Sequence, residues 1–192
     1  IVARPSEALD AAVSALGASA IAVPADLADA DAPDHAVEAA LTAFGRLDGA
    51  LLSVGGPPPG SVLTTTDDQW RASFDSVFLG SIRMARAVCT AIASCGHAAT
   101  GSLAWVLSTS AVEVFTGLTI SNGLRPGLAM LVKDLADEVG PSGIRVNGLL
   151  PGRIATDRLA ALDAASGDAA ASRAMASARI PLRRYGDPDE FA

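Results

Sequence analysis

The chain alternates short apolar runs with longer stretches whose apolar residues recur at helical spacing. The short runs predict strands at 1–3, 18–24, 48–53, 102–107 and 144–150. The longer stretches predict helices at 5–16, 33–44, 69–93, 118–139 and 156–177. Strands that alternate with helices across short loops form βαβ units. The pattern therefore predicts an α/β fold with a doubly wound parallel sheet that helices cover on both faces.

The loops that follow the predicted strands are the expected place for a ligand, because doubly wound sheets bind ligands outside the carboxyl ends of their strands. The run 48–53 holds five apolar or small residues out of six, which indicates a buried strand. Four loops are expected to line one crevice, and they are 25–29, 53–60, 108–117 and 151–157.

Composition narrows the range of functions. The chain has 192 residues, of which 50% are hydrophobic, and a net charge of −7. This fits one domain over 1–192 and supplies no basic stripe for nucleic acid. The apolar runs stop well short of the roughly 20 residues that a membrane-spanning helix needs. Cys89 and Cys95 are expected to be reduced thiols of a cytoplasmic protein. A small molecule, and neither nucleic acid nor a membrane, is the expected partner.

Two early segments hold candidate binding residues. The second predicted strand ends in Pro24-Ala25-Asp26-Leu27, and the third ends in Leu52-Ser53-Val54-Gly55. A glycine at position 55 lets a ligand pass close over the backbone, because a Cβ atom there would push it away. Asp26 has an alternative interpretation as a turn residue that bonds its own backbone.

Two later segments hold candidate catalytic and binding residues. Ser108 follows the fourth predicted strand, and thirteen positions later the run Ser121-Asn122-Gly123-Leu124-Arg125 begins. The four-residue separation places Ser121 and Arg125 on one helix face, one turn apart. The last predicted strand leads into Pro151-Gly152-Arg153-Ile154-Ala155-Thr156. Pro151-Gly152 alone could also be an ordinary turn after a strand.

In this order the four segments resemble the short-chain dehydrogenase/reductase family, and the resemblance covers nearly the whole chain. It implies a Rossmann-like dinucleotide fold that binds NADP or NAD. It also implies a carbonyl or alcohol substrate, as in 3-oxoacyl reductases, and a homo-oligomer that is a dimer or tetramer. Ser121-Asn122-Gly123-Leu124-Arg125 is similar to a subgroup with Ser-Asn-x-x-Arg in place of the family's Tyr-x-x-x-Lys.

The resemblance assigns a role to each segment. Asp26 and Leu27 would meet the adenine, and Ser53 and Gly55 would lie along the cofactor, with Gly55 under its ribose. Ser108 would hold the substrate oxygen. Four residues of the last segment would meet the nicotinamide end of the cofactor: Pro151, Gly152, Ile154 and Thr156. Of these, Ile154 and Thr156 would lie at the carboxamide or phosphate.

The departures from the family pattern concern proton transfer. Ser121 replaces the tyrosine, Arg125 replaces the lysine, and Val77 stands where the family has an asparagine. A serine hydroxyl is a much weaker acid than a phenol, and a guanidinium stays charged and relays no proton. Ser121 or water is therefore the expected proton donor beside Arg125. The alternative is a catalytically impaired binding module or partner subunit.

The family's glycine-rich phosphate loop and first strand have no counterpart in the sequence. The chain is therefore expected to be a fragment that lacks them at its N-terminus and lacks residues at its C-terminus. Arg4 directly follows the first apolar run, without an acidic residue beside it. It would favour the 2′-phosphate of NADP, or it is simply a solvated side chain at a strand end.

Overall fold

The computed structural model describes residues 1–96, 100–165 and 167–192. These residues form two compact units, Ile1–Leu149 and Leu150–Ala192. Each unit has its own helices and its own hydrogen-bonded contacts. Whether the two act as the single domain expected over 1–192 stays a prediction.

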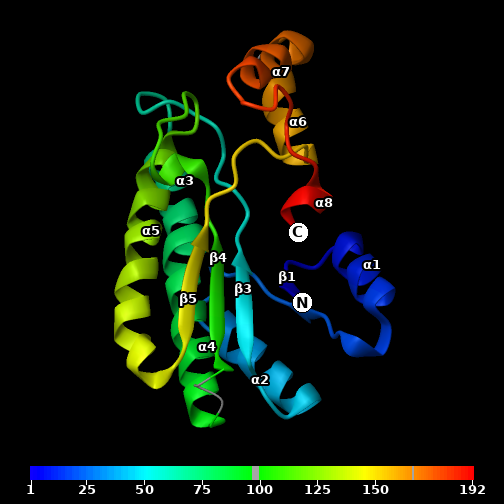
Figure 1. Ribbon diagram of the computed structural model, residues 1–192, viewed down its shortest axis with the longest axis vertical. Helices are drawn as coiled ribbons and strands as arrows, with labels where there is room; N and C mark the ends of the chain where they lie inside the picture. Colours follow the sequence, from blue (N-terminus) through cyan, green and yellow to red (C-terminus); the bar gives the residue numbers. More distant parts are fainter. Residues whose placement is uncertain (97–99, 166) are drawn as a thin grey trace. The chain divides into compact units, whose positions relative to one another are not determined.

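Strands and helices alternate along the first unit, as the apolar pattern predicts (Figure 1). Its strands are β1 (Val2–Ala3), β2 (Val23–Pro24), β3 (Gly49–Ser53), β4 (Ser102–Val106) and β5 (Arg145–Leu149). Its α-helices are α1 (Glu7–Leu16), α2 (Ala32–Phe44), α3 (Asp67–Ser73), α4 (Gly80–Ser94) and α5 (Thr119–Val139). A π-helical turn, Phe74–Leu79, makes α3 and α4 one continuous helical segment.

The strands pair in parallel, which confirms the predicted sheet type. The hydrogen-bonded order is β1-β2 in one sheet and β3-β4-β5 in the other. In the larger sheet Leu52 is level with Trp105, and Trp105 is level with Gly148. Parallel neighbours need long crossover connections, and α3, α4 and α5 provide them. The carboxyl ends of β3, β4 and β5 therefore share one edge.

Capping residues set the helix boundaries. The Ser6 hydroxyl accepts a hydrogen bond from the Leu9 amide at the start of α1. Thr66 and Gln69 form a reciprocal capping box at the start of α3. Gly45 ends α2 with φ of 72°, in the left-handed conformation that glycine adopts without strain. These starts and stops agree with the sequence pattern to within two residues.

One face of the larger sheet carries the core. A Cβ atom on Gly148 would meet the Val132 side chain of α5, so the level residues Trp105 and Leu52 also face the helices. Trp105 is 2% exposed, and α4 and α5 lie along this face (Figure 1). On the opposite face Leu51 is 63% exposed. Parallel strands flanked by helices confirm the predicted doubly wound α/β fold class.

Two predicted elements are shorter than expected. The strand predicted over 18–24 is reduced to β2, because a 3-10 turn occupies Gly17–Ser19. The single helix predicted over 156–177 is two helices, because Gly167 has φ of 91° and the Asp168 carboxylate caps the second helix. Alanine-rich periodicity does not reveal such a break.

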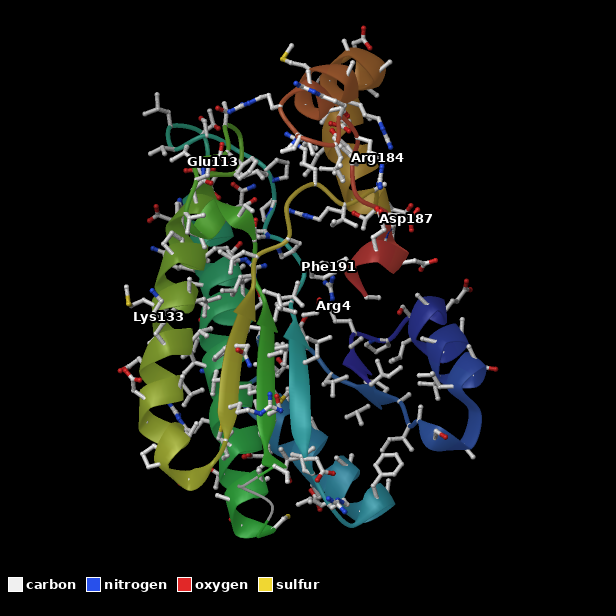
Figure 2. All side chains as sticks on the ribbon, viewed as in Figure 1. Arg4, Glu113, Lys133, Arg184, Asp187 and Phe191 are labelled. Atoms are coloured by element: carbon white, nitrogen blue, oxygen red, sulfur yellow. The ribbon has the colours of Figure 1, made fainter. Side chains whose placement is uncertain are left out.

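The second unit is helical. It contains α6 (Asp157–Ala164), α7 (Ala169–Ala178) and α8 (Pro188–Phe191). Arg184 and Asp187 lie on the segment that leads into α8 (Figure 2). Asp187 and Glu190 form a capping box around α8.

The helical segment Asp67–Ser94 is long and apolar enough to cross a membrane by length and composition alone. Arg83 and Arg86 interrupt its apolar residues, so it contains no long uninterrupted apolar run. Half of its most apolar window is buried inside the protein, as in the core helix of a folded domain.

Candidate active site

Hydrogen bonds connect three serines, two that follow β4 and one in α5. The Ser121 hydroxyl lies 2.9 Å from the Ser110 hydroxyl, and both are buried. The Ser108 hydroxyl accepts a hydrogen bond from the Ser110 amide at 3.1 Å. Ser110 therefore connects the two predicted catalytic serines, through its side chain to Ser121 and through its backbone to Ser108.

Sequence reasoning missed Ser110. Its signal was the Ser-x-Ser spacing, because a serine hydroxyl commonly bonds the amide two residues later and shapes a local turn. The turn here is the 3-10 segment Thr109–Ala111, which Ser108 caps. This local turn directs the Ser110 side chain toward α5. The role of Ser110 depends on its tertiary contact with Ser121, which the local sequence does not specify.

Arg125 is only 4% exposed, although its guanidinium carries a full charge. Its Nη1 donates to the main-chain oxygen of Val106, and its Nη2 donates to that of Val54, both at 3.2 Å. Val106 ends β4 and Val54 directly follows β3. Arg125 therefore ties the end of β4 to the residue that follows β3. The expected contact with ribose hydroxyls stays a prediction.

Asn122, the second residue of the Ser-Asn-x-x-Arg run, holds a loop through two hydrogen bonds. Its Oδ1 accepts from the Phe115 amide at 3.1 Å, and its Nδ2 donates to the Phe115 oxygen at 2.8 Å. This pair of bonds fixes the loop after β4 against the start of α5. Val77, in place of the family's asparagine, is buried, and its main-chain oxygen accepts from the Ser81 hydroxyl at 2.6 Å.

Two of the four predicted crevice loops are joined to each other. The Gly60 amide donates to the Gly117 oxygen at 2.8 Å, and the Thr119 amide donates to the Gly60 oxygen at 3.3 Å. Gly55 is exposed, and a Cβ atom added there would meet nothing within 4 Å. The backbone at the end of β3 therefore has open space beside it, which fits a ligand that passes over Gly55. Ser53 is also exposed.

The loop after β2 has an internal hydrogen bond and packs against α4. The Asp26 carboxylate accepts from the Ala28 amide at 3.0 Å, so Asp26 does form a turn. The Leu27 oxygen lies against Gly80, where a Cβ atom would collide with it. Arg4, after β1, is exposed (Figure 2). The adenine and 2′-phosphate roles of these residues stay predictions.

The predicted nicotinamide segment lies in the second unit. Gly152 is exposed, and a Cβ atom there would meet nothing within 4 Å. Ile154 forms an isolated parallel bridge with Gly186. The Thr156 hydroxyl accepts from the Leu159 amide at 3.4 Å and so caps α6. Pro151 is half-buried at the start of the segment.

A family model described as enoyl-(acyl carrier protein) reductase matches residues 2–192. The chain is 32% identical over 180 residues to L-rhamnose 1-dehydrogenase (NAD(P)(+)) of Azotobacter vinelandii, across 94% of this chain and 68% of that protein. It is 28% identical to the 3-oxoacyl-[acyl-carrier-protein] reductase of Synechocystis, across 99% of this chain and 73% of that protein.

The solved structures include L-sorbose reductase from Gluconobacter frateurii with NADPH and L-sorbose. It has a TM-score of 0.87 and 25% identity, across 99% of this chain and 75% of that chain. A parallel α/β unit with polar groups at its strand ends, matched over nearly its whole length, defines a Rossmann-like oxidoreductase. The chain belongs to the short-chain dehydrogenase/reductase family, whose members are NAD(P)-dependent oxidoreductases. These relatives give no support to a non-catalytic module.

Proposed function

We propose that the chain supplies the catalytic edge of an NAD(P)-dependent carbonyl reductase or alcohol dehydrogenase, with Ser108, Ser121 and Arg125 at the reacting oxygen. The observation that carries the proposal is the buried pair of hydroxyls, Ser110 and Ser121, 2.9 Å apart. A buried hydroxyl pair of this kind is a short path for a proton in a family that reduces carbonyls. Arg125 lies one helical turn after Ser121 in α5, on the same face of the helix.

The serines divide the work on the substrate oxygen. Ser108 is half-buried at the end of β4, and its hydroxyl donates to the carbonyl oxygen. Ser121 gives a proton to that oxygen as negative charge develops on it, and takes one back from Ser110. A serine alkoxide is too basic to persist, so Ser110 takes a proton from water as it gives its own to Ser121, and the hydroxide that forms passes to the solvent. The product is the alcohol, with one hydride and one proton added.

A nicotinamide cofactor, when bound, would supply the hydride. Gly55 and Ser53 would lie along the ribose, because the space beside Gly55 is open. Asp26 and Leu27 would meet the adenine, and Pro151, Gly152, Ile154 and Thr156 would meet the carboxamide. Arg125, tethered to Val54 and Val106, places a fixed positive charge at the strand ends. Such a charge stabilises an oxygen that becomes negative.

NADPH is the proposed cofactor, because Arg4 is exposed directly after β1 and a guanidinium suits a phosphate. A carbonyl or alcohol of small size is the proposed substrate. We also propose that the protein is a cytoplasmic homo-oligomer. The Arg4→Ala variant should weaken NADPH roughly tenfold and leave NADH unchanged, because one charged hydrogen bond to phosphate is lost. Equal losses for both cofactors would contradict the assignment of Arg4.

The test of the cofactor site is a fluorescence titration with NADPH. Gly55→Val fills the open space over which the ribose would pass, and should weaken binding at least about tenfold. Gly140→Val is the matched control, because a Cβ atom at Gly140 also meets nothing within 4 Å. It should leave binding unchanged. Equal behaviour of the two variants, or no binding by the unaltered protein, would contradict the cofactor proposal.

A further inference from the structure

A carboxylate is buried in the second unit, and three side chains gather around it. Asp163, at the end of α6, is 4% exposed. The Tyr185 hydroxyl lies 3.0 and 3.2 Å from its two oxygens, and the Ser172 hydroxyl of α7 donates to it at 2.9 Å. Burial of a carboxylate is costly unless hydrogen bonds replace its water. These donors therefore hold α6, α7 and the segment before α8 to one point.

Arg153 brings the predicted nicotinamide segment to the same point. Its Nη1 donates to the Tyr185 hydroxyl at 3.1 Å and lies 3.6 Å from Asp163 Oδ1. The guanidinium carbon of Arg153 is 5.6 Å from the centre of the Tyr185 ring, and that of Arg173 is 4.7 Å from it. The phenol therefore accepts from a cation and donates to a carboxylate, and both guanidinium groups lie near its ring.

The backbone repeats this connection beside the side chains. The Gly186 amide donates to the Arg153 oxygen at 2.9 Å, and the Ala155 amide donates to the Gly186 oxygen at 2.8 Å. These bonds make a short parallel bridge between residues next to Tyr185 and residues next to Arg153. Movement of the segment 151–156 would have to break this bridge and the Arg153–Tyr185 bond together.

We propose that Tyr185 is a positioning residue whose hydroxyl, held by Asp163, fixes the segment 151–156 in the conformation that receives the nicotinamide end of the cofactor. The cofactor part of this inference rests on the proposed function, whereas the fixing of the segment does not. Tyr185 is the only tyrosine in the chain, so its hydroxyl can be removed without ambiguity. The same contacts would link α6 and α7 to the cofactor segment.

The first readout is amide hydrogen exchange in the absence of cofactor. Tyr185→Phe keeps the ring near both guanidinium groups and removes the hydroxyl. Exchange at Ala155 and Gly186 should become roughly fivefold to tenfold faster, because one buried hydrogen bond that holds the bridge is lost. Exchange at β4 and β5 should not change. Ser172→Ala is the matched control, because it removes another hydroxyl donor to Asp163 and leaves the Arg153–Tyr185 bond. It should change exchange at Ala155 and Gly186 less than twofold.

The second readout is NADPH affinity of the same two variants. Tyr185→Phe should raise the dissociation constant several-fold, roughly in step with the exchange rates, and Ser172→Ala should not. Unchanged exchange at Ala155 and Gly186 in Tyr185→Phe would overturn the proposal. Faster exchange with unchanged NADPH affinity would overturn its cofactor part. If the unaltered protein binds no NADPH, the proposed function fails, and hydrogen exchange alone decides whether Tyr185 fixes the segment.

Discussion

Two arginines in this molecule hold different kinds of partner. Arg125, in the first unit, donates to the main-chain oxygens of Val54 and Val106 and is 4% exposed. Arg153, in the second unit, donates to the Tyr185 hydroxyl and lies beside the Asp163 carboxylate. The first arginine connects strand ends, and the second connects side chains from a loop and a helix.

The difference indicates what each region can do. Main-chain oxygens at strand ends are fixed by the sheet, so the Arg125 guanidinium is held in one place without adjustment by its partners. A fixed charge of this kind suits an oxygen that becomes negative during reaction. The partners of Arg153 belong to separate segments, so the second region depends on all of them being present together. The first region is suited to chemistry and the second to positioning.

Loss of Arg125 should have the largest effect on stability. Arg125→Ala leaves the oxygens of Val54 and Val106 without this donor and leaves a cavity where the side chain lay. The free energy of unfolding should fall by about 3 kcal/mol, measured by urea denaturation. Arg125→Lys keeps a charge but cannot span both oxygens as a planar guanidinium does, so its loss should be smaller. Equal stability of Arg125→Ala and the unaltered protein would contradict the role as a strand tie.

Loss of the Tyr185 hydroxyl should have a smaller effect, of about 1 kcal/mol at neutral pH. Burial, and then the hydrogen bond to Asp163, raise the pKa of the Tyr185 phenol. The folded state therefore keeps this proton to higher pH than the unfolded chain, whose phenol has a pKa of about 10. The contribution is present below about pH 10 and is lost as the pH rises through the folded-state pKa.

This pH dependence separates Tyr185 from other groups. The free energy of unfolding should be measured from about pH 8 to about pH 11, a range that includes the unfolded-state phenol pKa of about 10. Over this range it should fall more steeply for the unaltered protein than for Tyr185→Phe. All groups other than Tyr185 are the same in the two proteins, so their contributions cancel in the comparison. Parallel curves would show that the phenol has the same pKa in both states.

The exposed pair Arg184–Glu190 should have the smallest effect. The hydrogen bond from Arg184, and then that from the Asp187 amide, lower the pKa of Glu190 to about 2. Arg184→Gln should raise this pKa toward its ordinary value of 4.5, with the Asp187 amide still bound. Any stability from the lowered pKa is present above pH 4.5 and is lost as the pH falls toward 2. NMR titration of the Glu190 carboxyl carbon measures the change, and an unshifted titration would contradict the pairing.

Much of the fold could be predicted because apolar periodicity and capping residues act locally. The helices predicted over 33–44 and 69–93 begin and end within two residues of the observed boundaries, where Gly45 ends α2 and Thr66 caps α3. The strand predicted over 48–53 is present as β3, but apolar composition does not show which face of a strand is covered. Leu51 is accordingly exposed, while its neighbour Leu52 is buried.

The candidate site was predictable only in part. The spacing from Ser121 to Arg125 implied one helix face, which the single helix α5 confirms. Arg125 and Tyr185 each bond a residue far away in the sequence. Arg125 bonds Val54, and Tyr185 bonds Asp163. No local pattern specifies such contacts. The contact of Tyr185 with Asp163 therefore has no local sequence signature.

The most direct test of the proposed chemistry is the rate of NADPH oxidation with a panel of carbonyl compounds, for the unaltered protein and for Ser121→Ala. Ser94→Ala, at an exposed serine of α4, is the control. We expect turnover by the unaltered protein and by Ser94→Ala, and a fall of about 100-fold in Ser121→Ala with NADPH affinity unchanged. NADPH binding without turnover by the unaltered protein, or equal rates in Ser121→Ala, would contradict the role of the serine pair.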